Sequence, residues 1–219
     1  MRILVVGMGL IGGSICKSIK AATSHAVYGC DVQQAVLDDA IADGAIDGTG
    51  TMTDGTYDMI ILCLHQRIAI QMVQEALPKI PAGTILVDTC GLKGRMVRDL
   101  TYRCRKADVR YVGTHPMAGR EKNGYYASIP NLFQNANLIV TPVDGTDEAA
   151  LDTVKELADQ MGFGKIVTAT PMWHDNMIAY TSQLAHVVSS SYVKDFCMDD
   201  ALSFSGGSFQ DMTRVATMD

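Results

Sequence analysis

Three glycines near the amino terminus have a spacing that could bring phosphate groups against the protein backbone. They follow an apolar run that predicts a strand and precede a stretch with helical spacing. Gly7 would allow a tight turn, Gly9 lacks a Cβ and admits a pyrophosphate, and Gly12 lets the helix pack closely on the sheet. The helix start would add N–H groups and a positive dipole end. The expected contacts with a dinucleotide are Gly7, Met8, Gly9, Leu10, Ile11 and Gly12.

An acidic residue indicates which dinucleotide would bind. Asp31 ends the second apolar run, about twenty residues after the glycine turn. Its carboxylate could accept hydrogen bonds from both ribose hydroxyls. NAD is favoured over NADP, because a 2′-phosphate would meet a like charge and Val32, Gln33 and Gln34 supply no cation. The alternative is a domain of the same fold whose crevice binds nothing.

A histidine after a later apolar run could move a proton. His115 follows the strand predicted over residues 109–113, so it would emerge at the carboxyl edge of the sheet, where ligands bind in open α/β folds. Pro116 restricts it to extended geometry and Gly119 permits a turn soon after. Such an imidazole suits a dehydrogenase that takes a proton from a hydroxyl as hydride leaves the carbon. The alternative is a loop histidine that hydrogen-bonds only to the backbone.

The elements that would position these residues alternate along the chain. Short apolar runs and helical stretches follow one another, which predicts an α/β fold with a Rossmann-type, doubly wound, mostly parallel sheet. After Asp31, strands are predicted over 57–64, 84–88, 109–113, 137–141 and 165–168, and helices over 36–42, 69–77, 94–106 and 147–161.

The pattern changes at Thr170 and Pro171, which suit the N-cap and first turn of a helix. No strong breaker follows before Phe196, which predicts a helix of about 26 residues. We therefore expect an NAD-binding domain over 1–169 and the start of a short, apparently truncated all-helical substrate and dimerisation domain over 170–219. The helix has an apolar stripe that needs cover from this domain, from another chain or from sequence beyond Asp219. The stripe comprises Trp173, Met177, Tyr180, Leu184, Val188 and Tyr192.

Composition excludes several classes of protein. The net charge of −6 and the pI near 5.3 argue against nucleic acid or an anionic membrane as the main partner. No apolar run reaches the roughly 18 residues that span a bilayer, and the first strand leaves no room for a signal peptide. The cysteines form no metal-ligand spacing, so we expect a cytoplasmic protein with reduced thiols and no metal. They are Cys16, Cys30, Cys63, Cys90, Cys104 and Cys197.

Four separated motifs occur in order along the chain: the glycine turn over 7–14, the HPMAG core over 115–119 with Glu121 and Gly124, the segment from His174 to His186, and residues 206–216. Together they resemble the prephenate dehydrogenase family, which also contains arogenate dehydrogenases. The resemblance implies NAD-dependent oxidative decarboxylation of prephenate to 4-hydroxyphenylpyruvate, in tyrosine biosynthesis. It also implies a homodimer formed through the helical domain.

The resemblance further implies roles for individual residues. His115 would accept the hydrogen bond or proton of the ring hydroxyl, and Arg214 would bind a substrate carboxylate, which a planar guanidinium can pair bidentately. Gln183 and His186 would lie on a polar seam of the long helix that contacts substrate, or in a buried polar row of a bundle. His174 and Asp175 would cap that helix or brace the domain junction.

Leu64 and His65 follow a predicted strand and would border the nicotinamide half of the cofactor, unless His65 simply starts the next helix. The chain also departs from the family pattern. Gly91 stands where many relatives have a serine near substrate, so Thr89, Cys90 or a backbone N–H could substitute. Asn123, a further expected substrate contact, stands where serine is usual, and relatives normally continue for several more helices.

Three other functions remain open. The substrate could be arogenate, which has an amino group in place of the side-chain keto group. The protein could instead be a catalytically silent NAD(H)-binding module. Oxidation of another 3-hydroxy acid is disfavoured, because such enzymes use a lysine on the first long helix of the helical domain. The only lysine in the corresponding predicted helix of this chain is Lys194, near its end.

Overall fold

A computed structural model describes residues 1–194, 198–214 and 216, so Cys197 lies outside the described residues. The chain divides into two compact units, Met1–His174 and Asp175–Asp219. In this division the first turn of the long helix belongs to the first unit, whereas the sequence predicts a boundary between 169 and 170.

The first unit contains one eight-stranded sheet in the order β3-β2-β1-β4-β5-β6-β7-β8. Every neighbouring pair is parallel except β6 and β7. The predicted fold class, a mostly parallel doubly wound sheet followed by helices, is confirmed. The strands are β1 (Arg2–Val6), β2 (Ala26–Cys30), β3 (Gly48–Thr49), β4 (Met59–Leu62), β5 (Ile85–Asp88), β6 (Arg110–Pro116), β7 (Asn137–Val140) and β8 (Lys165–Thr168).

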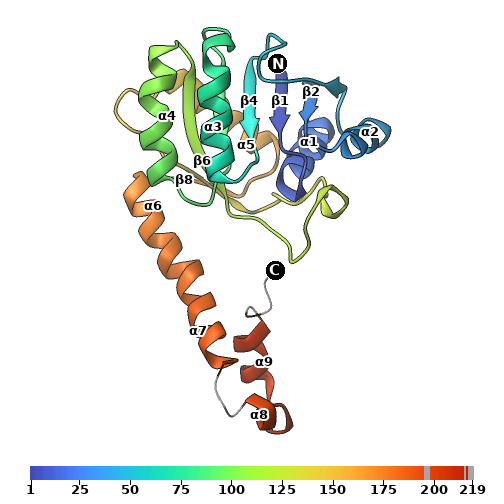
Figure 1. The fold of residues 1–219 in the computed structure, drawn as a ribbon, viewed down its shortest axis with the longest axis vertical. Coiled ribbons are helices and arrows are strands. Elements are labelled where there is room, and N and C mark those ends of the chain that lie inside the picture. The colour runs from blue at the N-terminus through green and yellow to red at the C-terminus, as the bar shows by residue number, and fades with distance from the viewer. Residues whose placement is uncertain (195–197, 215, 217–219) are drawn as a thin grey trace. The chain divides into compact units, whose positions relative to one another are not determined.

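Helices cover both faces of the sheet because side chains alternate along each buried strand. On β1, Ile3 and Val5 pack in the cluster that contains α1, α2 and α5, whereas Leu4 and Val6 pack with α3 and α4. Figure 1 shows α3 and α4 side by side over the strands. The helices are α1 (Leu10–Ala22), α2 (Gln34–Ala42), α3 (Gln66–Ala76), α4 (Gly94–Lys106) and α5 (Glu148–Gln160), with short turns η1 (Leu77–Lys79) and η2 (Tyr125–Ala127).

Strand β6 is longer than predicted. It was expected to end at Gly113 but continues to Pro116, because residues 114–116 pair antiparallel with residues 138–140 of β7. His115 therefore lies within a strand and not in a loop after one. The short strand β3 was not predicted, since two residues carry no apolar pattern.

The long helix begins as predicted, with the Trp173 backbone N–H donating to the Thr170 hydroxyl at 3.2 Å. The sequence predicts this helix to run to about Phe196; in the structure it ends at Tyr192, and Phe196 itself lies outside the described residues. The helix passes from α6 (Pro171–Ile178) through a π-helical segment, η3 (Ala179–Gln183), to α7 (Leu184–Tyr192). The Thr181 hydroxyl, in the π-helical segment, and the Ser191 hydroxyl, near the end of the helix, each donate to the backbone carbonyl four residues earlier. Such side-chain bonds compete with the regular backbone hydrogen bonds of a helix.

Two short helices of the second unit, α8 (Met198–Phe204) and α9 (Gly207–Arg214), were not predicted. Helix α9 packs on α7, and the rings of Tyr192 and Phe209 lie 5.7 Å apart. Much of the predicted apolar stripe stays exposed, including Trp173, Tyr180 and Leu184. Among the described residues, no helix is long and apolar enough to cross a membrane.

The loop between β5 and α4 buries a lysine. Lys93 has no exposed surface, and its ammonium pairs with Asp88 and donates to the Thr114 backbone carbonyl. Asp88 also accepts from the Tyr111 hydroxyl at 2.6 Å and the Cys90 backbone N–H at 2.9 Å. Burial raises the pKa of Tyr111 well above its usual value, so that hydroxyl keeps its proton and donates. The network connects the end of β5 to the residue before His115.

Replacing Lys93 should therefore destabilise the protein strongly. Lys93→Met leaves the Asp88 carboxylate buried without its cation, so we expect the free energy of unfolding to fall by about 3–5 kcal/mol. The double variant Asp88→Asn/Lys93→Met removes both charges and should recover part of that loss. Urea unfolding followed by circular dichroism measures both.

Lys155→Met is the matched control, because Lys155 pairs with Asp152 at the surface. Its unfolding free energy should change by less than about 0.5 kcal/mol. A Lys93→Met protein no less stable than this control would contradict the assigned role of the buried pair.

Candidate active site

The glycine turn is open where a phosphate would bind and closed where the helix meets the sheet. Gly7 has φ +93°, which favours glycine, and its N–H donates to the Cys30 carbonyl at 2.8 Å. A Cβ on Gly12 would lie 1.8 Å from the Gly7 carbonyl oxygen, whereas a Cβ on Gly9 would meet nothing within 4 Å. No side chain caps α1 at Gly9. This turn therefore offers backbone N–H groups at a helix start with space in front of them.

Asp31 is held at the rim of this turn. Its Oδ2 accepts from the Met8 backbone N–H at 2.7 Å, and its Oδ1 accepts from the Gln33 N–H at 2.9 Å. Each carboxylate oxygen has more than one acceptor position, so both can still bind hydroxyl donors. The neighbouring Val32 is 99% exposed. The structure thus brings Asp31 and the glycine turn together and leaves no cation beside the carboxylate at Val32, Gln33 or Gln34.

Leu64 and His65 lie where β4 ends, next to the same turn. A Cβ on Gly7 would come within 2.8 Å of Leu64 Cδ2, so the leucine side chain borders the turn. His65 is the N-cap residue of α3 and is exposed. This position at the start of a helix, on the carboxyl edge of the sheet, is compatible with both interpretations of His65: that it borders the nicotinamide, or that it simply starts the helix.

His115 lies in β6 opposite Ile139 and contacts a second histidine. Its Nδ1 is 2.9 Å from Nε2 of His174, and the two rings meet edge to face with centroids 5.1 Å apart. The other side of the His115 ring faces Gly91, where a Cβ would lie 3.7 Å from Nε2. Sequence reasoning missed the pair, because the two residues are 59 positions apart and no spacing rule connects them.

The two side chains that precede Gly91, where a serine is usual in the family, both donate to backbone carbonyls. The Thr89 hydroxyl donates to the Leu62 carbonyl at 3.1 Å, and the Cys90 thiol donates to the Leu64 carbonyl at 3.4 Å. Burial raises the pKa of Cys90 to about 12, so this thiol stays protonated at neutral pH. Both side chains therefore donate to backbone carbonyls at the end of β4 or just after it.

The remaining expected site residues lie elsewhere. Asn123 is exposed in the loop between β6 and η2. Gln183 ends η3, His186 lies in α7 and Arg214 ends α9, all within the second unit. The first unit therefore contains the glycine turn, Asp31, Gly91, His115 and Asn123, and the second unit contains Gln183, His186 and Arg214.

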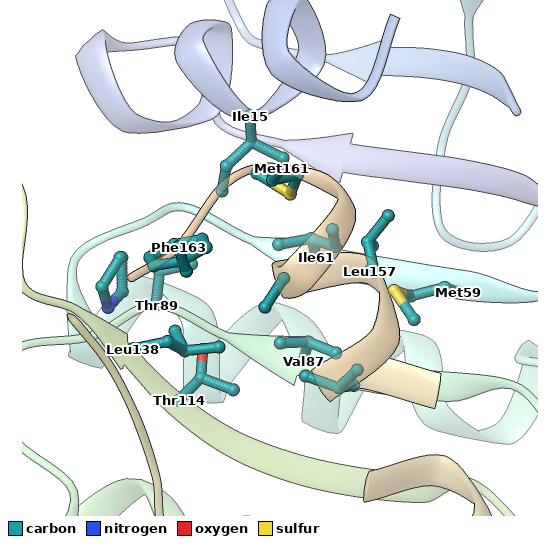
Figure 2. Close-up of a pocket in the computed structure, with 13 residues that line it drawn as sticks. Ile15, Met59, Ile61, Val87, Thr89, Thr114, Leu138, Leu157, Met161 and Phe163 are labelled. Carbon is teal, nitrogen blue, oxygen red and sulfur yellow. The ribbon is translucent and has the colours of Figure 1, made fainter. Parts of the chain in front are cut away.

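An apolar cavity lies between α5 and one face of the sheet (Figure 2). Its 13 lining residues are apolar or threonine, with Leu157 of α5 and Met161 and Phe163 beyond it packed over side chains of β4 and β5. A small acid with two carboxylates needs cationic or N–H partners. We therefore assign this cavity to imperfect core packing and not to substrate binding.

Across residues 1–194, 198–214 and 216, no group of three histidine, cysteine or acidic residues is placed to hold a metal ion. The described cysteines are Cys16, Cys30, Cys63, Cys90 and Cys104, and all are free thiols.

Comparison with known proteins identifies the family. Residues 15–168 match the model of the prephenate dehydrogenase nucleotide-binding domain, and residues 170–219 match that of the prephenate dehydrogenase dimerization domain. The prephenate dehydrogenase of Bacillus subtilis is 29% identical over 98% of this chain. This chain spans about 60% of the length of that relative.

Two solved structures share the fold over the whole chain. One is the prephenate dehydrogenase of A. aeolicus in complex with hydroxyphenyl propionate and NAD+, with a TM-score of 0.86, 29% identity and 79% of that chain covered. The other is the arogenate dehydrogenase of Synechocystis, with a TM-score of 0.85, 25% identity and 80% of that chain covered. With two family models matched in order over nearly all of its length, the chain belongs to the prephenate dehydrogenase family.

Proposed function

We propose that this protein uses NAD+ to oxidise and decarboxylate prephenate to 4-hydroxyphenylpyruvate. The observation that carries the proposal is the position of His115, whose imidazole is fixed at the carboxyl edge of the sheet that carries the glycine turn. A relative of the same fold was solved with NAD+ and an aromatic acid. Since this chain is shorter than its curated relatives, activity of the chain itself is part of the proposal.

The residues around the glycine turn fit NAD. The backbone at Gly9 and the start of α1 would bind the pyrophosphate, and Asp31 would accept the ribose hydroxyls. Leu64 and His65 would border the nicotinamide. When bound, the cofactor supplies the hydride acceptor.

His115 would handle the proton of the ring hydroxyl. As hydride leaves the carbon that bears this hydroxyl, Nε2 of His115 accepts the hydroxyl proton. The carboxylate on the opposite ring carbon departs as CO2, and the electrons of the broken C–C bond complete the aromatic ring. The product is a phenol, so the proton returns from His115 to the same oxygen and the histidine ends as it began. Because aromatisation drives the step, the protein mainly has to position the ring and accept this proton.

The second unit would bind the substrate carboxylate through Arg214, and Gln183 and His186 would be further contacts. From the first unit, Gly91 would leave room beside His115 and Asn123 would add an amide. These roles follow the family motifs. We propose with them that the chain consists of an NAD-binding domain over 1–169 and a substrate and dimerisation domain over 170–219.

We also propose a homodimer in the cytoplasm. The exposed apolar side chains Trp173, Tyr180 and Leu184 lie in the segment that matches the dimerization domain, and a second copy would cover them. Reducing conditions in the cytoplasm suit a chain whose described cysteines are all free thiols.

Arogenate is the second candidate substrate, favoured by the likeness to the Synechocystis enzyme named for it. The two compounds differ only in a side-chain keto or amino group, so the same chemistry at His115 serves both. Purified protein incubated with each compound and NAD+, with NADH absorbance recorded, compares the two. Cofactor binding without turnover of either compound would instead support a silent NAD(H)-binding module.

The role of His115 can be tested by His115→Asn. Asparagine keeps a polar group in the strand but cannot accept the proton, so kcat should fall by about 10²- to 10⁴-fold. NAD+ affinity, measured by fluorescence titration, should stay within about twofold, since the glycine turn and Asp31 are untouched. His25→Asn, at the distant amino end of β2, is the control and should keep full activity. Unchanged turnover in His115→Asn would remove this residue from the mechanism.

Cofactor preference should follow residue 31. Asp31→Ser combined with Val32→Arg removes the carboxylate and places a cation at an exposed position beside it. We expect kcat/KM for NAD+ to fall by about 10- to 100-fold, because a charge-assisted hydrogen bond to ribose is lost, and kcat/KM for NADP+ to rise. Val32→Arg alone keeps Asp31 and should still prefer NAD+. Equal use of both cofactors by the wild type would contradict the role of Asp31.

A further inference from the structure

We propose that His174 is the positioning residue for His115, holding its imidazole in the tautomer that can accept a proton at Nε2. This inference rests on the proposed function and extends it by one residue. Sequence motifs gave His174 a capping or bracing role, whereas the structure places its ring against the proposed base at 2.9 Å.

Both rings are held by elements that leave them little freedom. The His115 backbone is paired with β7, and the preceding Thr114 carbonyl accepts from the buried Lys93. His174 lies in the first turn of α6, where its N–H donates to the Thr170 carbonyl at 2.9 Å. His174 as a whole residue is 1% exposed. The nitrogen-to-nitrogen contact is therefore a partly buried feature of the first unit, formed by a strand and a helix start.

The hydrogen bond between the rings determines which nitrogen of His115 is basic. A neutral imidazole has one N–H and one acceptor nitrogen. If His174 donates, Nδ1 of His115 accepts, and the His115 proton must sit on Nε2, where it blocks the base. If His115 donates from Nδ1, its Nε2 is the acceptor on the side that faces Gly91. Catalysis needs the second arrangement, so His174 must accept at Nε2 and carry its own proton on Nδ1.

The same bond would strengthen as the reaction proceeds. Once Nε2 of His115 has taken the hydroxyl proton, its Nδ1–H belongs to a cation and the bond to His174 becomes charge-assisted. An interaction that is stronger in the transition state than in the ground state lowers the barrier. Loss of His174 should therefore reduce kcat and leave KM for both substrates nearly unchanged.

The first experiment compares His174→Leu with His174→Gln. Leucine fills the space but accepts nothing, so kcat should fall by about 10- to 100-fold. Glutamine can present its carbonyl oxygen to the Nδ1–H of His115 and should keep kcat within about fivefold of wild type. KM for NAD+ and for prephenate should stay within about twofold in both variants. A purely structural role would lower stability in both without this rescue by glutamine.

The second experiment reads the tautomer directly and needs no turnover. The chain has five histidines, so long-range 1H–15N spectra of the imidazoles are simple, and the signals lost in His115→Asn assign that residue. We expect His115 to carry its proton on Nδ1 in the wild type. In His174→Leu it should shift toward the Nε2–H form that is usual for a free side chain.

The outcomes separate the inference from the proposed function. Wild-type protein that turns over neither prephenate nor arogenate overturns the function, while the spectra still decide the role of His174. An Nε2–H tautomer at His115 in the wild type overturns the inference, even where His174→Leu fails to fold. Full turnover by His174→Leu, or equal losses in the leucine and glutamine variants, also overturns it.

Discussion

The geometry of the site depends on the buried ion pair between Lys93 and Asp88. An ammonium removed from water must find its partners within the protein, and these include the Asp88 carboxylate at the end of β5 and the Thr114 carbonyl on β6. The loop between β5 and α4 can therefore not move independently of β6. Because Gly91 lies in that loop and His115 follows Thr114, the pair fixes the distance between the glycine and the imidazole.

The antiparallel pairing of β7 with β6 adds a second constraint. It keeps residues 114–116 in a strand, so the proposed base is carried by a hydrogen-bonded sheet and not by a flexible loop. Sites built on strands hold side chains more accurately than sites on loops. Strand β7 also pairs with β8, and α6 begins just after β8. His174 in the first turn of α6 is thereby held against the His115 ring.

Local patterns in the sequence predicted the parts of the site that depend on local geometry. The glycine turn, Asp31 and the Thr170 cap each require particular residue types at short spacing, and the structure places them as that spacing predicts. The extension of β6 was missed because Pro116 and Gly119 are typical of a loop, and only pairing with distant residues makes the segment a strand. The π-helical segment and the His115–His174 contact were missed for a similar reason, since both depend on bonds that no apolar period encodes.

A hydrogen bond between two imidazole nitrogens also limits how many protons the pair can hold. One nitrogen must offer a lone pair, so the two rings at 2.9 Å cannot both be imidazolium without losing the bond and gaining a like-charge contact. The pair can therefore accept one proton beyond its neutral state. Conversion of prephenate to a phenol and CO2 releases no proton overall, because the hydroxyl proton returns to the product oxygen. Two histidines that together can hold one added proton, taken and then returned, match the requirement of the proposed reaction.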